Sequence, residues 1–302
     1  MPTSHFPITL LERGQIDGRA WDDCVDNSAQ AQPYARSWYL DMIAPGWKAL
    51  VQKDGEGGYQ AVLPLPWRRK WRIGRPQVVP PLFSQQLGVF GPCTDPAIWL
   101  DLARAEFRQI RINWHAGAEP KAAGFEASPR LNMTLPLLAD MEQIRQGYNS
   151  NTRRNLKKAR NAGWVLDHEF HETEFMDCLI KNQGPKIEGV GRQDYELVGK
   201  IIHRALELRQ GSYLAARNAA GELGAGVFTL SGSKGPCYMF GTSSESGRKD
   251  AAMPLLFDSL FEHYLDQERF DFEGSQIPGL ARFYKGFGAL EETYWQLASV
   301  SD

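Results

Sequence analysis

The stretch that decides the fold is residues 236–297, PCYMFGTSSESGRKDAAMPLLFDSLFEHYLDQERFDFEGSQIPGLARFYKGFGALEETYWQL. It predicts a strand, a turn, a long amphipathic helix, a buried strand, a short helix and a final strand. Met253, Phe257 and Leu260 of the long helix recur at spacings of three and four, which gives one wide apolar face. That face must cover a sheet, and two strands joined by a helix imply a right-handed crossover between a largely parallel pair.

The composition is that of an ordinary globular protein. The 302 residues correspond to about two domains, and 42% of them are apolar. A net charge of −2 gives no overall nucleic-acid footprint, so a polyanion would have to meet a local basic patch. The scattered cysteines and histidines have no metal-site spacing, and we expect a reduced, cytoplasmic protein without a metal. The sequence shows neither a secretory signal nor an apolar run of the roughly 20 residues that a membrane span needs.

The order of elements suggests an internal duplication. Strands, helices and a strand pair around the turn at 54–58 come first, and then a helix begins at Pro96 with Asp95 as its N-cap. That helix and the following RINWHAG (111–117) match the helix at 251–267 and the following RFDFEGS (269–275) in kind and order. We therefore expect an α/β fold of two tandem copies, with mixed sheets. Residues 1–138 would be a degenerate copy, because only 139–302 contains GLARFYKGFGA.

Two segments are strongly basic. The first is a rim at 68–75 interleaved with Trp67 and Trp71; it is either a polyanion contact or a solvated hairpin with inward tryptophans. The second is a helix capped by Asn149 or Ser150, which follows a short helix capped by Asp140. This helix holds either a polyanionic donor or the domain junction. Its cations are Arg153, Arg154, Lys157, Lys158 and Arg160.

The order meander, turn, helix, strand, short helix, strand resembles the GNAT acyltransferase fold, in which two parallel central strands splay apart around the donor thioester. LARFYKGFGA (280–289) is similar to the last helix of that superfamily. The resemblance implies that Tyr284 protonates the leaving thiolate. A phenol with an ordinary pKa of about 10 is protonated at neutral pH and can act as a general acid. The alternative is an ordinary core aromatic.

The donor loop of the superfamily aligns with residues 247–252. There, backbone N–H groups and the helix dipole hold the pyrophosphate of coenzyme A. Asp250 stands where the superfamily has glycine, so we expect its carboxylate to repel a pyrophosphate, although it would cap the next helix well. Arg248 and Lys249 would partly offset the repulsion. The donor-binding candidates are Arg248, Lys249, Ala252 and Tyr238.

Tandem copies, the basic helix SNTRRNLKKARNAG (150–163) and the pattern DFxGS, GLxxF, GFG are similar to the Fem-type branch. Its best-known members transfer an amino acid from aminoacyl-tRNA to the amine of a peptidoglycan precursor. They usually have Lys directly after the Phe of the last helix, where this chain has Tyr284. The spacing of Arg192 and Tyr195 is also one residue shorter than in those enzymes. The substrate-binding residues implied by the resemblance or placed near the cleft are Arg192, Tyr195, Arg282, Lys285, Arg153 and Arg154.

The residues favour direct attack by the acceptor amine, because no GxSxG motif occurs and no cysteine has a neighbouring histidine. Glu273 and Asp271 lie on one face of a strand, and either could accept the amine proton or pair with an arginine. We expect an N-acyltransferase without a permanently bound cofactor. Its donor would be acyl-CoA or aminoacyl-tRNA, and its acceptor an amine-bearing small molecule or cell-envelope precursor. The alternative is a non-catalytic ligand-binding protein on the same scaffold.

Overall fold

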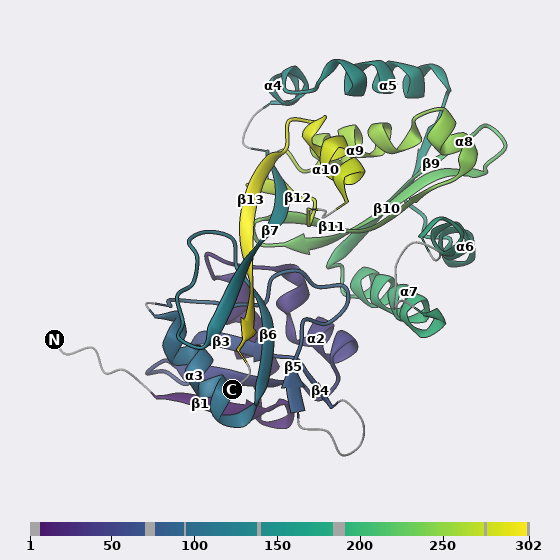
Figure 1. Ribbon diagram of the computed structural model, residues 1–302. Helices are drawn as coiled ribbons and strands as arrows, with labels where there is room; N and C mark the ends of the chain where they lie inside the picture. Colours follow the sequence, from purple (N-terminus) through teal and green to yellow (C-terminus); the bar gives the residue numbers. More distant parts are fainter. Residues whose placement is uncertain are drawn as a thin grey trace. The chain divides into compact units, whose positions relative to one another are not determined.

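The computed structural model describes residues 7–69, 76–93, 95–137, 140–183, 191–274 and 277–300. The chain forms two compact units (Figure 1). The first contains residues 1–132 and 292–302, and the second contains residues 133–291. The chain passes from the first unit to the second within β7 (Phe125–Pro136) and returns within β13 (Leu290–Ser299).

The first unit follows the order of elements expected from the sequence, and Asp17 and Asp95 cap its two longest helices with their side chains. Three strands, β1 to β3, form an antiparallel sheet, and β4, β5, β6 and β13 follow one another as hydrogen-bonded neighbours. Besides β7 and β13, its elements are β1 (Ile8–Glu12), η1 (Arg13–Gln15), α1 (Gly18–Asp26), η2 (Pro33–Ala35), α2 (Ser37–Ile43), β2 (Lys48–Lys53), β3 (Tyr59–Leu65), β4 (Trp67–Arg69), β5 (Pro76–Val78), α3 (Pro96–Glu106) and β6 (Gln109–Trp114).

The core of the first unit depends on the last strand of the chain. Leu297 pairs with Ile112 in the β13–β6 ladder and is fully buried in the cluster that contains Trp99 and Phe107 of the α3 region. The order of elements in the sequence predicts a single boundary at residue 138, with 139–302 in the second copy. Only long-range pairing with β6 assigns the end of β13 to the first unit, and no local pattern reports such pairing.

In the first unit, the parallel strands β5 and β6 pair over a short length only. Beyond that length, another segment of the chain lies beside β6. β5 and β6 pair at Gln77 with Gln109 and at Val78 with Ile110. Beyond these pairs the backbone N–H of Leu87 donates to the carbonyl oxygen of Asn113 at 2.8 Å. A remaining cavity of only about 10 Å³ is lined by Pro66, residues 78–81, Ser84, Gln85, Leu87 and residues 111–113. The wedge between these two strands is therefore occupied by residues 84–87.

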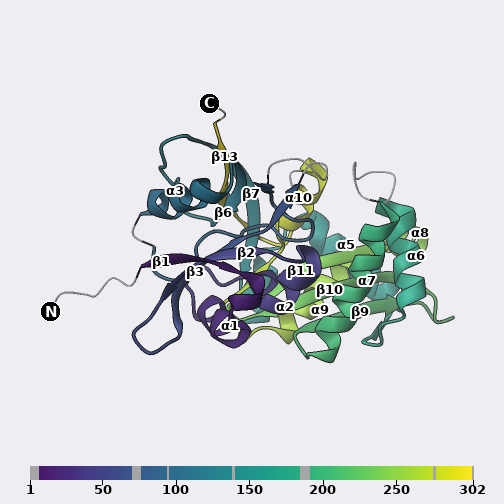
Figure 2. The same cartoon turned by 90° about the horizontal axis from the view of Figure 1, so that it is seen from below.

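The second unit is one sheet with helices on both faces. The strands lie in the order β7, β12, β11, β10, β9, β8. α6 and α7 cover one face and α9 and α10 cover the other (Figures 1 and 2). The elements are α4 (Met141–Gln146), α5 (Ser150–Asn161), β8 (Val165–Asp167), α6 (Glu172–Gln183), α7 (Arg192–Glu207), β9 (Gly211–Arg217), β10 (Leu223–Gly232), β11 (Gly235–Ser243), α8 (Glu245–Lys249), α9 (Ala252–His263), β12 (Arg269–Asp271) and α10 (Pro278–Lys285).

The basic helix predicted from the sequence is α5, and it packs on α9. The side chains of Asp140 and Asn149 cap α4 and α5, which confirms the predicted helix starts. Asp258 of α9, only 3% exposed, accepts hydrogen bonds from the side chains of Arg145, Tyr148 and Arg160 at 2.9–3.1 Å. A buried carboxylate thus fastens the α4–α5 pair to the long helix.

Candidate active site

The strand β12 presents different chemistry on its two faces. The rings of Phe270 and Phe272 lie 5.9 and 5.4 Å from the ring of Phe257 in α9. Because side chains alternate along a strand, Asp271 lies on the opposite face. The aromatic face belongs to the core under α9 and α10. The acidic face is turned toward the opposite side of the sheet, which α6 and α7 cover.

β11 runs parallel to β12 for a single pair, Cys237 with Asp271, which confirms the predicted parallel pairing. Beyond that pair, β11 carries a bulge: Tyr238 opposes Thr229 and Phe240 opposes Phe228, which leaves Met239 as the extra residue. A bulge bends its strand and increases its twist. β11 therefore turns away just after its contact with β12, as in the splayed strand pair that the GNAT resemblance implies.

Tyr284 lies in the aromatic layer beside this point. It is 4% exposed, and its ring stacks on Phe272 with centroids 4.6 Å apart and planes inclined by 23°. Tyr238 lies on the same side, 6.4 Å from Tyr284, and its hydroxyl occupies the space where a β-carbon on Gly241 would stand. Burial, with smaller contributions from Tyr238 and Glu273, raises the pKa of Tyr284 well above its usual value. The phenol is therefore protonated at neutral pH.

Glu273 follows β12 in an unusual backbone conformation. Its φ is 55°, in the left-handed region that costs a residue with a β-carbon about 1–2 kcal/mol. The carboxylate of Asp271 stabilises the turn by accepting the backbone N–H of Glu273 at 2.8 Å. Burial first and the charge of Asp271 second raise the pKa of the Glu273 carboxyl well above its usual range. The nearby Cys237 thiol lowers that pKa in part.

The segment that aligns with the donor loop is a short helix, α8. A β-carbon on Gly247 would lie 1.7 Å from the carbonyl oxygen of Gly224, so only glycine lets α8 pack this closely on β10. Asp250 does not cap α9, and that expectation was wrong. The N-cap is Ala251, in the left-handed conformation with φ 57°, because Asp250 ends α8 instead.

Asp250 is held by residues far away in the sequence. Its carboxylate lies 3.7 Å from the ammonium of Lys158 in α5, and its carbonyl oxygen accepts the indole N–H of Trp164 at 3.2 Å. Lys158 also donates to the carbonyl oxygen of Lys249. The positive charge that compensates the Asp250 carboxylate therefore comes from α5. Arg248, which was expected to offset that carboxylate, instead donates to Asn182 and to the carbonyl oxygen of Ser243, at 2.7 and 2.6 Å.

These contacts bring the two basic segments of the second unit together. Lys158 joins the end of α8 to α5, so the cations of α8 and α5 lie on neighbouring elements. Arg160 forms an ion pair with Asp258. Among the described residues, Arg153 donates to the carbonyl oxygen of Gln146 in α4, and Arg154 donates to the side-chain oxygen of Asn151 in α5; both acceptors are neutral.

The remaining candidate residues are more scattered. Ala252 is fully buried, so neither its side chain nor its backbone is exposed to a donor in this structure. Lys285 of α10 forms an ion pair with Glu291 at 2.6 Å, and Arg282 is exposed on the same helix. Arg192 is exposed and pairs with Glu196, whereas Tyr195 is buried; both belong to α7. Within the described ranges, neither residue forms a hydrogen bond or an ion pair with Tyr284 or Glu273.

Sequence reasoning missed two participants. The sequence predicts only that the cysteines are reduced, and the register of the parallel pair, which places Cys237 beside Asp271, is the one signal that could have located it. Lys158 was predicted to be basic, but its partner Asp250 belongs to a different segment. Local patterns do not encode such contacts.

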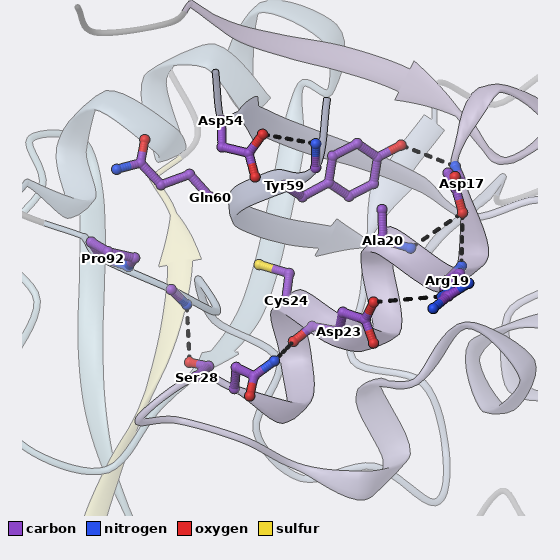
Figure 3. A pocket seen from close by; sticks show the side chains of 13 residues that line it. Asp17, Arg19, Ala20, Asp23, Cys24, Ser28, Asp54, Tyr59, Gln60 and Pro92 are labelled. Carbon is purple, nitrogen blue, oxygen red and sulfur yellow. Dashed lines mark hydrogen bonds and ion pairs between the residues drawn. The ribbon is translucent and has the colours of Figure 1, made fainter. Parts of the chain in front are cut away.

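A cavity of about 420 Å³ lies in the first unit between α1, the β2–β3 turn and residues 91–92 (Figure 3). Its carboxylates have structural tasks: Asp17 caps α1, and Asp54 accepts the backbone N–H groups of Glu56 and Gly58. Burial raises the pKa of Cys24 to about 12, so this thiol is not a nucleophile at neutral pH. The cavity lacks an acid–base pair suited to acyl transfer.

Two further properties concern the described part of the chain. No three or more His, Cys, Asp or Glu side chains within it are arranged to hold a metal ion. None of its helices combines the length and apolar character needed to cross a bilayer.

No protein-family model matches the sequence, and no curated protein matches it either. Solved structures do match. FemX has a TM-score of 0.71 at 12% identity, covering 95% of this chain and 96% of that chain. A protein of unknown function from Bacteroides thetaiotaomicron has a TM-score of 0.64 at 11% identity, covering 98% and 99%. L-PGS from Bacillus licheniformis has a TM-score of 0.56 at 11% identity, covering 95% and 92%.

Proposed function

The chain has the Fem-type tandem GNAT fold, and on this basis we propose that its second unit transfers an acyl or aminoacyl group to an amine. The observation that supports this proposal is the arrangement around β12. A protonated phenol, Tyr284, lies on one side of the strand, and a buried carboxyl, Glu273, follows its other face where β11 bends away. In the first unit, the corresponding wedge is filled by residues 84–87, which favours the second unit as the site.

The reaction requires no covalent intermediate. The amine nitrogen attacks the carbonyl carbon of a thioester or ester, and the new C–N bond forms as the C–S or C–O bond breaks. Glu273, as carboxylate, takes the proton that the nitrogen loses. Tyr284 gives its proton to the leaving sulfur or oxygen and is reprotonated through solvent, so no net charge accumulates.

The donor in this proposal is acyl-CoA or aminoacyl-tRNA, both of which carry phosphates. The basic residues of α5 and α8 are the proposed contacts for those phosphates, with Arg154 and Lys157 on the exposed side of α5. The pairing of Asp250 with Lys158 reduces the repulsion that this carboxylate would exert on a pyrophosphate. Arg282 and Lys285 of α10 are proposed to bind a phosphate or carboxylate of the substrates. The proposed acceptor is an amine-bearing small molecule or cell-envelope precursor.

The donor is tested by calorimetric or thermal-shift titration of the full chain with acetyl-CoA, longer acyl-CoAs and charged tRNA. We expect saturable binding of one class and its weakening in Arg154→Glu/Lys157→Glu. Arg204→Glu, a charge reversal on the exposed surface of α7, is the matched control and should leave binding unchanged. Saturable stabilisation by coenzyme A thioesters would rule out the tRNA donor.

One observation favours the second candidate function, a binding protein without catalysis. The donor-loop segment is folded into α8, and its terminal Asp250 is already engaged by Lys158 and Trp164. A ligand that saturates the protein while no acyl transfer to any of a panel of amines is detected would support this function instead.

A further inference from the structure

The turn between α4 and α5 lies against the turn that ends α10. Consecutive residues of the two turns face one another in reverse order: Gly147 with Gly288, Tyr148 with Phe287, and Asn149 with Gly286. The backbone N–H of Asn149 donates to the carbonyl oxygen of Gly286 at 2.9 Å. The rings of Tyr148 and Phe287 meet edge to face, with centroids 5.3 Å apart. The GFG motif after α10 is thus one half of a contact, the α5–α10 joint, whose other half leads into α5.

The two glycines of the motif permit this close approach. A β-carbon on Gly286 would lie 2.6 Å from Oγ1 of Thr152, in the first turn of α5, and 2.9 Å from the carbonyl oxygen of Phe283 in its own helix. Thr152 is only 4% exposed, so its side chain has little room to turn away. Gly288 has a φ of 84°, and a β-carbon on it would lie 3.3 Å from the carbonyl oxygen of Gly147. A side chain at either position would push the end of α10 away from α5.

The other end of α5 is attached to the segment that aligns with the donor loop. Lys158 donates to the carbonyl oxygen of Lys249, and its ammonium lies 3.7 Å from the carboxylate of Asp250. Since an α-helix rises 1.5 Å per residue, Asn149 and Lys158 are separated by about 14 Å along the helix axis. One continuous helix therefore connects the end of α8 with the end of α10.

Tyr284 belongs to the last turn of α10. It precedes Gly286 by two residues, and its carbonyl oxygen accepts the backbone N–H of Phe287 at 3.0 Å. The ring is held on its other side by the stacking on Phe272. The position of the phenol is therefore set both by the aromatic layer and by the α5–α10 joint. A displacement of the joint would move the backbone that carries the phenol.

We propose that Gly286 and Thr152 are positioning residues, which hold the Tyr284 hydroxyl at the correct distance from a donor bound at α5 and α8. The inference rests on the proposed function for the donor and for the role of Tyr284 as acid. A single helix contacts both the segment proposed to bind phosphate and the turn that carries the acid. The distance between leaving group and proton donor is thus fixed by a helix. Catalysis depends steeply on such distances, because a misplacement of about 1 Å can cost about 100-fold in rate.

The test is ¹⁹F NMR of the full chain labelled with 3-fluorotyrosine, with Tyr284→Phe identifying the signal. We expect Gly286→Ala to shift this signal, because the new β-carbon meets Thr152. Thr152→Ala/Gly286→Ala removes the nearest contact and should return the signal part of the way to that of the parent. Gly279→Ala is the matched control, because a β-carbon on this glycine of the same helix would have no atom within 4 Å. It should leave the signal unchanged. An unshifted signal in Gly286→Ala would overturn the proposal.

Kinetic measurements separate this inference from the proposed function. If transfer occurs, Gly286→Ala should lower kcat about 10- to 100-fold at unchanged KM for the donor, and the double variant should recover part of kcat. A loss of stability in urea with normal kcat would contradict the positioning role. If the ¹⁹F shift is found but no donor and amine react, the joint still positions Tyr284 and the proposed transferase function fails.

A second variant keeps the test valid if Gly286→Ala does not fold. Thr152→Ala removes the contact from the α5 side and adds no volume to the joint. It should also shift the Tyr284 signal and lower kcat, whereas a signal and a kcat equal to those of the parent would overturn the proposal.

Discussion

Glu273 and His115 hold equivalent places in the two copies, since each is the fifth residue of its strand motif, RFDFE and RINWH. His115 is buried and contacts the carbonyl oxygen of Val89 at 3.0 Å through Nε2. Burial lowers the pKa of its imidazole to about 4. The first copy thus has a neutral imidazole where the second has a carboxyl of raised pKa. Two buried titratable groups at matching motif positions thus lead to opposite pH predictions.

His115 should make the protein acid-sensitive. Its folded pKa lies below the unfolded value of 6.5, so the unfolded state binds more protons between pH 6.5 and about 4. Stability is full above the unfolded pKa and falls as pH decreases through this window. The loss amounts to on the order of 3 kcal/mol. In His115→Gln, urea unfolding between pH 4 and 7 should give a flatter pH dependence. An unchanged slope would contradict the assignment.

Glu273 should change the pH dependence of stability in the direction opposite to His115. Its folded pKa is raised, so the native state binds more protons than the unfolded state above about pH 4.5. Stability therefore decreases as pH rises toward the folded pKa. In Glu273→Gln this decrease is removed, and the variant should gain stability relative to the parent at pH 8 but not at pH 4. Urea unfolding at the two pH values measures the difference, and Glu245→Gln, near the surface of α8, is the control.

Tyr284→Phe tests the proposed acid. The phenyl ring keeps the stacking on Phe272, so folding should be retained while the leaving group loses its proton donor. We expect kcat to fall by about 10²–10⁴-fold with little change in KM. Tyr264→Phe, which removes a hydroxyl 3.4 Å from Thr229, is the control. Full activity of the Tyr284 variant would exclude this residue as the acid.

Much of this arrangement could be predicted. Strand alternation places Asp271 and Glu273 near one face, and the last-helix pattern identifies Tyr284. The left-handed turn at Glu273 could not be predicted, because it depends on an Asp271 hydrogen bond and on burial. The partner of Asp250 was equally inaccessible, since Lys158 lies in another element.

At the scale of elements, α5 divides its cations between two directions. Leu156 and Ala159 are buried, Arg160 reaches Asp258 of α9, and Arg154 remains on the exposed side. The sequence predicted the helix, its cap and its charge. Which of these cations supports packing could not be predicted, because Asp258, the buried acid that pairs with Arg160, lies in the later helix α9.

Asp258→Asn should loosen the α4–α5 pair. The change removes the charge that Arg145 and Arg160 share, but these arginines are 35% and 55% exposed and regain water. We therefore expect a loss of about 2–3 kcal/mol, below the usual range for a fully buried pair. Glu262→Gln is the matched control, because Glu262 meets the same Arg145 at 60% exposure and should change stability by less than about 1 kcal/mol. Urea unfolding measures both, and equal losses would contradict a special role of Asp258.

At the scale of the whole molecule, the duplicated order of elements predicts the tandem fold, and the similarity to FemX confirms it. The path of the chain is less regular than that order suggests. β13 begins in the second unit and ends in the first, where Trp295 pairs with Trp114. Sequence patterns indicate a strand at this position but contain no information about its distant partner.

Leu297→Ala should therefore destabilise the first unit, although the residue lies near the far end of the chain. Removing a fully buried leucine side chain costs about 2–5 kcal/mol. Hydrogen exchange should show lost protection in α3 and β6 and no change in β9 and β10. Leu290→Ala, at a site 56% exposed, is the control. Equal loss of protection in β9 and β10 would contradict the assignment of Leu297 to the first unit alone.

The return of β13 also has a consequence for biosynthesis. The ribosome adds about 5–20 residues per second, so several seconds or more separate the emergence of β6 from that of its neighbour β13. Throughout that interval the β6 edge lacks its final partner, and the nascent first unit exposes apolar surface around Trp99 and Ile112. The second unit can begin to fold before the first is complete. During translation, this exposed apolar surface makes the N-terminal part of the protein prone to aggregation until β13 emerges.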